Sequence, residues 1–141
     1  MLMGTYEHRL DSKARLVLPA KIREKLGDVV VGTIGLEKCI FLYSETEWEN
    51  FAGKIRNLDF YSKDDHRKAA RAWLMNAHEM PIDNMRRVLL PQALREYAGL
   101  KQEVVVCGVN DHTEIWDKEK LDAIYKFGQD NLSELTRDMG F

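Results

Sequence analysis

Two arginines of this sequence close the same short motif, Asp-x-x-x-Arg, at Asp11–Arg15 and again at Asp83–Arg87. A guanidinium can donate two parallel hydrogen bonds to the O6 and N7 atoms of guanine, which a lysine cannot match. Aspartate favours the start of a turn because its carboxylate accepts hydrogen bonds from nearby backbone N–H groups. The motif therefore predicts two hairpin turns, each structured by its aspartate, at whose tips Arg15 and Arg87 could reach double-stranded DNA. The alternative is an arginine that only pairs with its own aspartate. A single copy would favour this alternative, whereas the repetition of the motif and the cations beside it favour the DNA contact.

Other cations lie beside the two turns. Lys13 belongs to the first turn, Arg86 belongs to the second, and Arg9 precedes the first. We expect these three side chains to contact phosphate groups, which adds affinity and salt dependence but little sequence information. Met85 stands where the first turn has Lys13, so the first turn is predicted to be the better DNA contact.

The charge of the chain is unevenly distributed. The formal net charge is −2 for 141 residues, but six cations and two anions fall between Arg9 and Lys25, a local balance of +4. Such a basic segment on an acidic chain suits a protein that shows one face to a polyanion. No apolar run approaches the roughly 20 residues needed to span a bilayer, and no secretory signal precedes the first motif. We therefore expect a cytoplasmic, nucleoid-associated protein without a membrane partner, whose thiols stay reduced.

The sequence offers no set of residues for catalysis or metal binding. The four histidines have no metal-ligand spacing with one another or with cysteine, and a zinc site needs three or four convergent ligands. No nucleophile-base-acid set or glycine-rich phosphate loop is present. We predict that the protein is not an enzyme and has no metal, cofactor or small-molecule substrate. The four histidines are His8, His66, His78 and His112, and the two cysteines are Cys39 and Cys107.

The motif lies within a longer internal repeat. When residues 7–27 are placed over residues 79–99, a shift of 72 positions, eight of 21 pairs are identical and apolar positions stay in phase. Each copy predicts a strand, the turn, a second strand, a short helix that begins after proline, and a final pair of strands. Glycine follows each short helix, where a left-handed residue is favoured. The expected strands are 16–18, 29–33, 39–43, 88–90, 103–109 and 113–116; the short helices are 20–26 and 92–98, followed by Gly27 and Gly99.

Longer helices follow each copy, over residues 45–58, 63–77 and 118–135. Ser44 is the expected N-cap of the first, with Glu47 in the position of a capping-box partner. Apolar side chains on these helices are predicted to pack in the core and in part on a neighbouring protomer. On the short helices, Arg23 and Arg95 are each followed by glutamate, which predicts local ion pairs.

Each half of the repeat is too small to bury a full core alone. We therefore expect the halves to interlock or to exchange strands in an α+β fold with a mainly β core. The predicted fold is one pseudo-symmetric double-hairpin barrel made of two β-β-α-β-β halves, with added helices. The predicted divisions are a first domain at 1–48, a helical connection at 49–76, a second domain at 77–120, and a C-terminal helix and tail at 121–141.

The segment from Asp11 to Pro19 resembles the SpoVT-AbrB type of swapped-hairpin DNA-binding domain, and its tandem copy from Asp83 to Pro91 makes the whole chain similar to the MraZ family. The resemblance implies that the protein forms a ring and binds short direct repeats in the promoter of the cell-division and cell-wall genes, which usually include its own gene. It implies a transcriptional regulator that acts mainly as a repressor and whose Asp-x-x-x-Arg turns carry the DNA contacts, with Arg15 and Arg87 as the principal residues. Family members often have glycine before the arginine, where this chain has Ala14 and Arg86.

One other class of function fits the same resemblance. An antitoxin-like or scaffold module of this fold would chiefly bind protein. Antitoxins of this kind usually have one copy followed by a disordered tail, and here a second copy occupies that place. The repeat therefore favours a DNA-binding regulator.

Overall fold

The computed structural model describes all of residues 1–141, and its elements follow the repeat. The strands are β1 (Thr5–Arg9), β2 (Arg15–Val17), β3 (Val29–Ile34), β4 (Ile40–Ser44), β5 (His78–Pro81), β6 (Arg87–Leu89), β7 (Glu103–Val109) and β8 (His112–Asp117). The helices are α1 (Ala20–Leu26), α2 (Glu45–Arg56), α3 (Asp64–Met75), α4 (Gln92–Ala98), α5 (Lys118–Asp130) and α6 (Leu132–Leu135). The predicted α+β class with a mainly antiparallel β core is confirmed.

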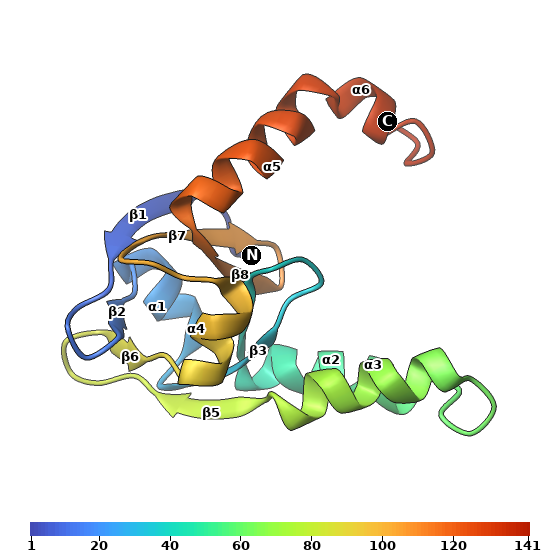
Figure 1. Cartoon of the computed structure of the whole chain (residues 1–141), viewed down its shortest axis with the longest axis horizontal. Helices are drawn as coiled ribbons and strands as arrows, with labels where there is room; N and C mark the ends of the chain where they lie inside the picture. Colours follow the sequence, from blue (N-terminus) through green and yellow to red (C-terminus); the bar gives the residue numbers. More distant parts are fainter.

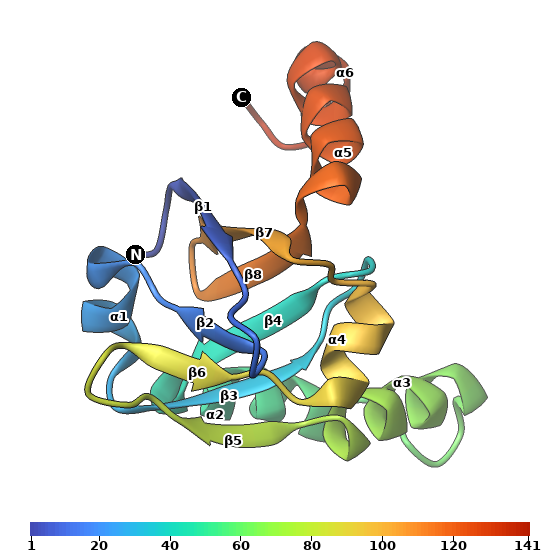
Figure 2. The same ribbon diagram turned by 60° about the vertical axis from the view of Figure 1, so that its left-hand side comes forward.

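The two halves exchange strands. A six-stranded antiparallel sheet has the order β1-β7-β8-β4-β3-β5, and β2 pairs with β6 in a separate two-stranded ribbon. Strands β1 and β2 of the first half thus pair with β7 and β6 of the second, while β5 of the second half pairs with β3 of the first. Figures 1 and 2 show β2 and β6 side by side over the larger sheet.

Two details of the predicted strand arrangement differ. The strands on either side of each turn were expected to form a hairpin ribbon, but β1 and β2 pair with different partners. The reason is that each turn connects the large sheet to the small ribbon, so the two strands diverge after the turn. The strands are also hydrogen-bonded into two separate sheets, so the expected single barrel is not confirmed.

The main core lies between the ribbon and the large sheet. Along β2 and β6 the side chains alternate, so Leu16, Leu18, Val88 and Leu90 point inward and are at most 1% exposed. They join a cluster of 16 buried residues that includes Ile22 and Leu26 of α1 and Leu94 and Ala98 of α4. The inner face of the ribbon is therefore fully used in packing, and only its outer face is available to a partner.

A second, smaller core covers the opposite face of the large sheet. It contains Cys39, Phe41, Tyr43 and Trp116, with Trp48 and Phe51 of α2 packed against it. Residues 39–43 alternate between the two cores, as the two-residue period of a strand requires. The sheet is thus buried on both faces near its centre.

Local predictions agree well with the structure in the repeat. Both short helices have the predicted bounds, and the hydroxyl of Ser44 accepts a hydrogen bond from the backbone N–H of Glu47 at 3.2 Å. Gly99 has the expected left-handed conformation, with φ 60° and ψ 37°. Gly27 does not, because its ψ of −159° takes the chain directly into β3.

Three local predictions were wrong. Arg23 pairs with Asp28 instead of the following glutamate, and Arg95 donates to the carbonyl of Leu90 and makes no ion pair. Both guanidiniums donate to backbone carbonyl groups at the ends of the short helices. The carboxylate of a neighbouring glutamate has no donor for these carbonyls. The C-terminal helix is broken at Asn131, whose side-chain amide donates to the carbonyl of Phe127.

Two helical arms project from the β body (Figure 1). The α2–α3 arm comprises residues 45–75, and the α5–α6 arm comprises residues 118–135. Neither α5 nor α6 contains a buried residue. No helix is both long enough and apolar enough to cross a membrane.

Candidate nucleic-acid interface

The first Asp-x-x-x-Arg turn is held by its aspartate. Oδ1 of Asp11 accepts hydrogen bonds from the backbone N–H groups of Lys13 and Arg15, both at 2.9 Å. Oδ2 of the same carboxylate accepts from Nε of Arg15 at 2.7 Å. The backbone closes the turn, since Ala14 donates to the carbonyl of Asp11 at 3.0 Å. One carboxylate therefore fixes both the loop and the direction of the arginine.

The second turn repeats this geometry. Oδ1 of Asp83 accepts from the backbone N–H groups of Met85 at 2.9 Å and Arg87 at 2.8 Å. Oδ2 accepts from Nε of Arg87 at 2.8 Å. The hydrogen bonds that hold the two turns are thus the same, although the sequences between aspartate and arginine differ at every position.

Both aspartates are held in the ionised form. The backbone hydrogen bond from Arg15 is the main cause that lowers the pKa of Asp11 below its usual value, and the side-chain bond from the same residue adds to it. Arg87 acts on the pKa of Asp83 in the same way. Each carboxylate therefore accepts without competition from a proton at neutral pH.

The aspartates leave the outer end of each guanidinium free. Only Nε of Arg15 and Nε of Arg87 bond to a carboxylate, and neither arginine makes a hydrogen bond through its Nη atoms. The side chains are 30% and 24% exposed, so each is partly packed and partly accessible to solvent. A guanidinium oriented in this way can donate both Nη groups to one planar acceptor pair.

The ribbon places the two arginines on one face. Arg15 lies opposite Leu89 and Arg87 lies opposite Val17 in the β2–β6 register. The arginines are therefore diagonal neighbours, for which the spacing in an antiparallel pair is about 7–8 Å. All four side chains point away from the core, because their sequence neighbours point into it. The sequence identified the arginines but not Val17 and Leu89. The alternation of side chains along a strand could have placed Val17 on the face of Arg15, and Leu89 on the face of Arg87.

The other predicted cations differ in their surroundings. Lys13 and Arg86 are exposed and make no ion pair. Arg9 pairs with Glu103 across β1 and β7 at 3.1 Å, and both side chains are more than half exposed. An exposed pair of this kind contributes about 0–1 kcal/mol and can be exchanged for a phosphate contact. Lys13 and Arg86 are the cations that need no such exchange.

The residue before each arginine has a left-handed backbone. Ala14 has φ 59° and Arg86 has φ 61°, a region that costs an L-residue about 1–2 kcal/mol relative to its usual conformations. The tight turn requires this conformation, because the carbonyl of Asp11 and the N–H of Ala14 must meet across it. Both turns thus carry backbone strain that glycine would relieve.

We expect Ala14→Gly to stabilise the protein by about 0.5–1 kcal/mol, since relief of the strained φ exceeds the added entropy of the unfolded chain. The midpoint of urea denaturation measures this difference. Ala20→Gly is the matched control, because Ala20 begins α1 with ordinary helical geometry. The control should lose up to about 1 kcal/mol. A destabilised Ala14→Gly variant would contradict the strain.

His112 lies in a separate polar cluster on β8. Its Nδ1 is 2.7 Å from Oδ1 of Asp111 and its Nε2 is 2.9 Å from Oε2 of Glu114, which also accepts from Nε1 of Trp116. Burial alone would lower the pKa of His112, but its hydrogen bonds to Glu114 and Asp111 outweigh burial and raise that pKa above 6.5. Burial would likewise raise the pKa of Glu114, but bonds from His112 and Trp116 lower it. The cluster favours an imidazolium between two carboxylates.

We expect His112→Gln to lower the free energy of unfolding more at pH 6 than at pH 9. A raised folded-state pKa contributes stability that is complete below the unfolded value and is lost as the pH rises through the folded value. Glu114, whose pKa is lowered, stays ionised at both pH values. Urea denaturation at the two pH values measures the effect, with His8→Gln as control because His8 has no acidic partner. Equal losses at both pH values would exclude a stabilising imidazolium.

Comparison with known proteins finds a family and relatives that match most of this chain. A sequence profile of the family described as "MraZ protein, putative antitoxin-like" matches residues 1–71 and 73–139. A protein of Acetivibrio thermocellus named "Transcriptional regulator MraZ" is 42% identical over 133 residues, which cover 94% of this chain and 91% of that protein. Another of this name, from Natranaerobius thermophilus, is 40% identical over 139 residues, which cover 99% of this chain and 96% of that protein. A third, from a Thermoanaerobacter strain, is 45% identical over 119 residues, with 84% and 82% covered.

Proposed function

The chain belongs to the MraZ family, and we propose that it is a transcriptional regulator that recognises specific double-stranded DNA through its two Asp-x-x-x-Arg turns. The observation that carries the proposal is the pair of arginines on the outer face of the β2–β6 ribbon. Each is anchored to an aspartate at Nε and free at its Nη atoms. This orientation leaves both Nη groups of each arginine available to a planar acceptor pair.

The mechanism follows from the size of the ribbon and the reach of its arginines. A two-stranded ribbon fits the major groove of DNA, where guanine presents O6 and N7 to a guanidinium. Arg15 and Arg87 would each take one such base. Lys13 and Arg86, with Arg9 once it leaves Glu103, would contact phosphates on either side. Asp11 and Asp83 act within the protein, because a carboxylate near phosphates would repel them.

A single ribbon supplies few base contacts, so we propose that several protomers act together. A ring oligomer would place several ribbons on successive direct repeats, and the effective concentration within the ring would raise the affinity. The operator would lie in the promoter of the cell-division and cell-wall genes, including the gene of the protein itself, and binding there would repress transcription. A regulator of this kind acts in the cytoplasm, at the nucleoid.

The two helical arms support contact between protomers. The α5–α6 arm exposes the large apolar side chains Ile124, Tyr125, Phe127, Leu132 and Leu135. The outer part of the α2–α3 arm exposes Phe60 and Tyr61 at its tip, and residues 54–68 carry five cations and three anions. Residues 130–138 carry one cation and three anions, so the arms have complementary charge. Contact between different arms of neighbouring protomers is head-to-tail, the arrangement that closes into rings.

We expect the double substitution Ile124→Asp and Phe127→Asp to dissociate the oligomer without unfolding the protomer. The two side chains are 41% and 60% exposed and lie three residues apart on one face of α5. Light scattering coupled to size-exclusion chromatography measures the mass. Lys126→Gln, an exposed change on the same helix, is the control and should leave the mass unchanged. An unchanged mass for the double variant would exclude this arm as the interface.

The division of the chain is also a proposal. We propose that residues 1–48 and 77–120 are two SpoVT-AbrB-type units of one duplicated barrel-like body, joined by residues 49–76 and followed by residues 121–141. The common element order of the halves supports it. Helices α2 and α5 run through two of the boundaries, so the units are repeats of one body and are not separated by linkers.

An antitoxin-like role is the second candidate, since the description of the matching family includes that likeness. It would use the protein mainly to bind another protein. Selection of bound sequences from a pool of random DNA tests the first proposal against it. We expect a recurring, guanine-containing repeat, and the absence of any enriched sequence would contradict DNA recognition.

A further inference from the structure

The outer face of the ribbon carries two apolar side chains beside its arginines. Leu89 is 61% exposed, and Val17 is partly exposed. They occupy equivalent positions in the two repeats, each two residues after the arginine of its turn. An exposed apolar residue alone is common on protein surfaces. Its occurrence at the same place in both repeats, on the face that holds the arginines, calls for a shared partner.

The fold itself makes no use of Leu89. Its neighbours Val88 and Leu90 fill the core, and the packed clusters do not include Leu89. A polar strand former at this position would leave the inner face unchanged and would avoid an exposed leucine. The side chain is therefore available to whatever the ribbon contacts.

We propose that Leu89, together with Val17, contacts the C5 methyl groups of thymine in the major groove, so that the ribbon distinguishes thymine beside the bases held by its arginines. The inference rests on the proposed DNA recognition and adds a second kind of base contact to it. Thymine is the base that presents a methyl group in the major groove, and apolar side chains are its usual partners. The arginines alone recognise guanine and do not distinguish thymine from cytosine.

The register places each apolar side chain next to a guanidinium. Leu89 lies directly opposite Arg15, and Val17 lies directly opposite Arg87. Side chains opposite each other in an antiparallel pair have Cβ atoms about 4.5–5.5 Å apart. Successive bases of one strand are about 3.4 Å apart along the duplex. The thymine is therefore expected within one or two base pairs of the guanine bound by Arg15.

The charges around the ribbon support DNA as the occupant of this face. Two turn cations without acidic partners, Lys13 and Arg86, flank the face, and each arginine retains free Nη atoms. An apolar protein partner would be poorly matched to four cations around two apolar side chains. Leu89 is longer and more exposed than Val17, so we expect it to make the larger contribution.

The test replaces the thymine methyl group alone. DNA containing the selected sequence is prepared with each thymine changed in turn to deoxyuridine, which lacks only the C5 methyl. Affinities of the full-length oligomeric protein are measured by fluorescence anisotropy. We expect one or two positions at which deoxyuridine weakens binding about fourfold, the effect of one methyl-sized apolar group. At the position with the larger effect, the Leu89→Ala variant should bind thymine and deoxyuridine equally.

Two further variants separate the methyl contact from other effects. Leu89→Met keeps an apolar side chain of similar reach and should keep the preference for thymine. Leu36→Ala removes another leucine, 74% exposed in the loop between β3 and β4, and should change neither affinity nor preference. Equal binding of thymine and deoxyuridine at every position by the unaltered protein would overturn the inference while leaving DNA recognition intact. An undiminished preference in Leu89→Ala at every position would assign the contact elsewhere. Absence of any specific DNA binding would overturn the proposed function and this inference with it.

Discussion

The Arg15→Ala variant is expected to lose sequence-specific DNA binding while it stays folded and oligomeric. A bidentate contact between arginine and guanine contributes about 1–3 kcal/mol, which corresponds to roughly 5- to 150-fold in affinity at one site. A ring that binds several repeats loses the contact once per bound protomer, so the losses multiply. The fold should survive because Arg15 contributes only an exposed ion pair, worth about 0–1 kcal/mol, through its side chain.

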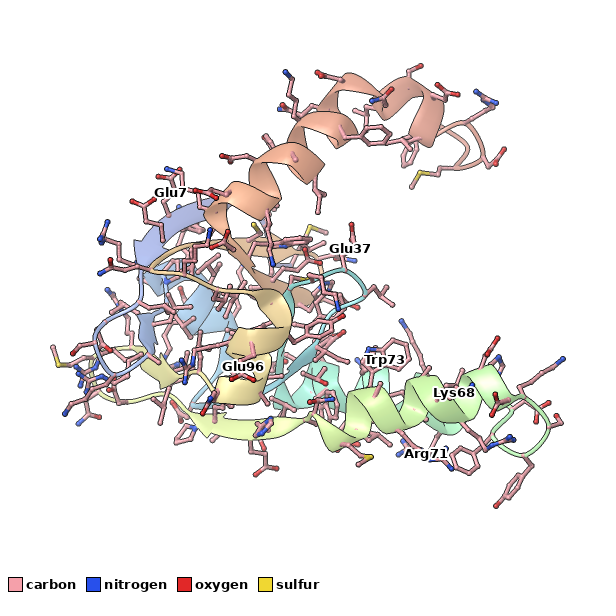
Figure 3. All side chains as sticks on the ribbon, viewed as in Figure 1. Glu7, Glu37, Lys68, Arg71, Trp73 and Glu96 are labelled. Atoms are coloured by element: carbon pink, nitrogen blue, oxygen red, sulfur yellow. The ribbon has the colours of Figure 1, made fainter.

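Gel-shift titration on the promoter of the protein's own gene measures this loss, with circular dichroism and light scattering to check folding and mass. Arg15→Lys keeps the charge but not the planar pair of donors, so it should also lose specificity. Lys13→Ala should weaken cognate and unrelated DNA alike, as expected of a phosphate contact. Arg71→Ala removes an exposed arginine of α3, far from the ribbon (Figure 3), and is the matched control. Unchanged cognate binding by Arg15→Ala would rule out the proposed recognition.

The structure reduces the asymmetry that the sequence predicts between the two turns. The sequence favours the first turn because it has the cation Lys13 at the position where the second turn has the uncharged Met85. In three dimensions, however, the hydrogen bonds of Asp11 and Asp83 are equivalent, and both arginines share one face. The remaining difference is the position of the extra cation, which is Lys13 in one turn and Arg86 in the other.

Features that depend on neighbours in sequence could be predicted. The bounds of α1 and α4 follow from proline before and glycine after a short apolar period, and the cap at Ser44 follows from its spacing to Glu47. The repeat also pointed to halves that need each other. These signals are local or are comparisons of the chain with itself, so no knowledge of tertiary contacts was required.

Strand partners and side-chain partners could not be predicted in the same way. Pairing of β2 with β6 joins residues about 70 positions apart, and the sequence of either strand is compatible with a simple hairpin. Which face of the ribbon is buried depends on that pairing, so Leu89 could not be placed beside Arg15 in advance. The partners of Arg23 and Arg95 were missed because backbone carbonyls at helix ends compete with nearby carboxylates.

The exchange of strands has a large consequence for stability. Four of the six strand pairings join the first half of the chain to the second, and only β3–β4 and β7–β8 lie within one half. The main core of 16 residues draws equally on both, with Leu16 and Val88 meeting across the ribbon. Either half alone would therefore leave most of its strand edges unpaired and much of its core exposed.

We expect residues 1–76 and residues 77–141, produced separately, to be unfolded as monomers, and to regain structure when mixed in equal amounts. Domains are stable by only about 5–15 kcal/mol in total. The apolar burial lost when the core is divided would cost far more free energy than that. Circular dichroism and the dispersion of amide resonances measure folding before and after mixing. Because the halves are alike, one half could pair with a second copy of itself. Folding of that kind would require a dimer, so the circular dichroism signal would depend on protein concentration. A folded monomeric half with concentration-independent, cooperative unfolding would show that the halves are autonomous, and would exclude the interlocked body proposed for the chain.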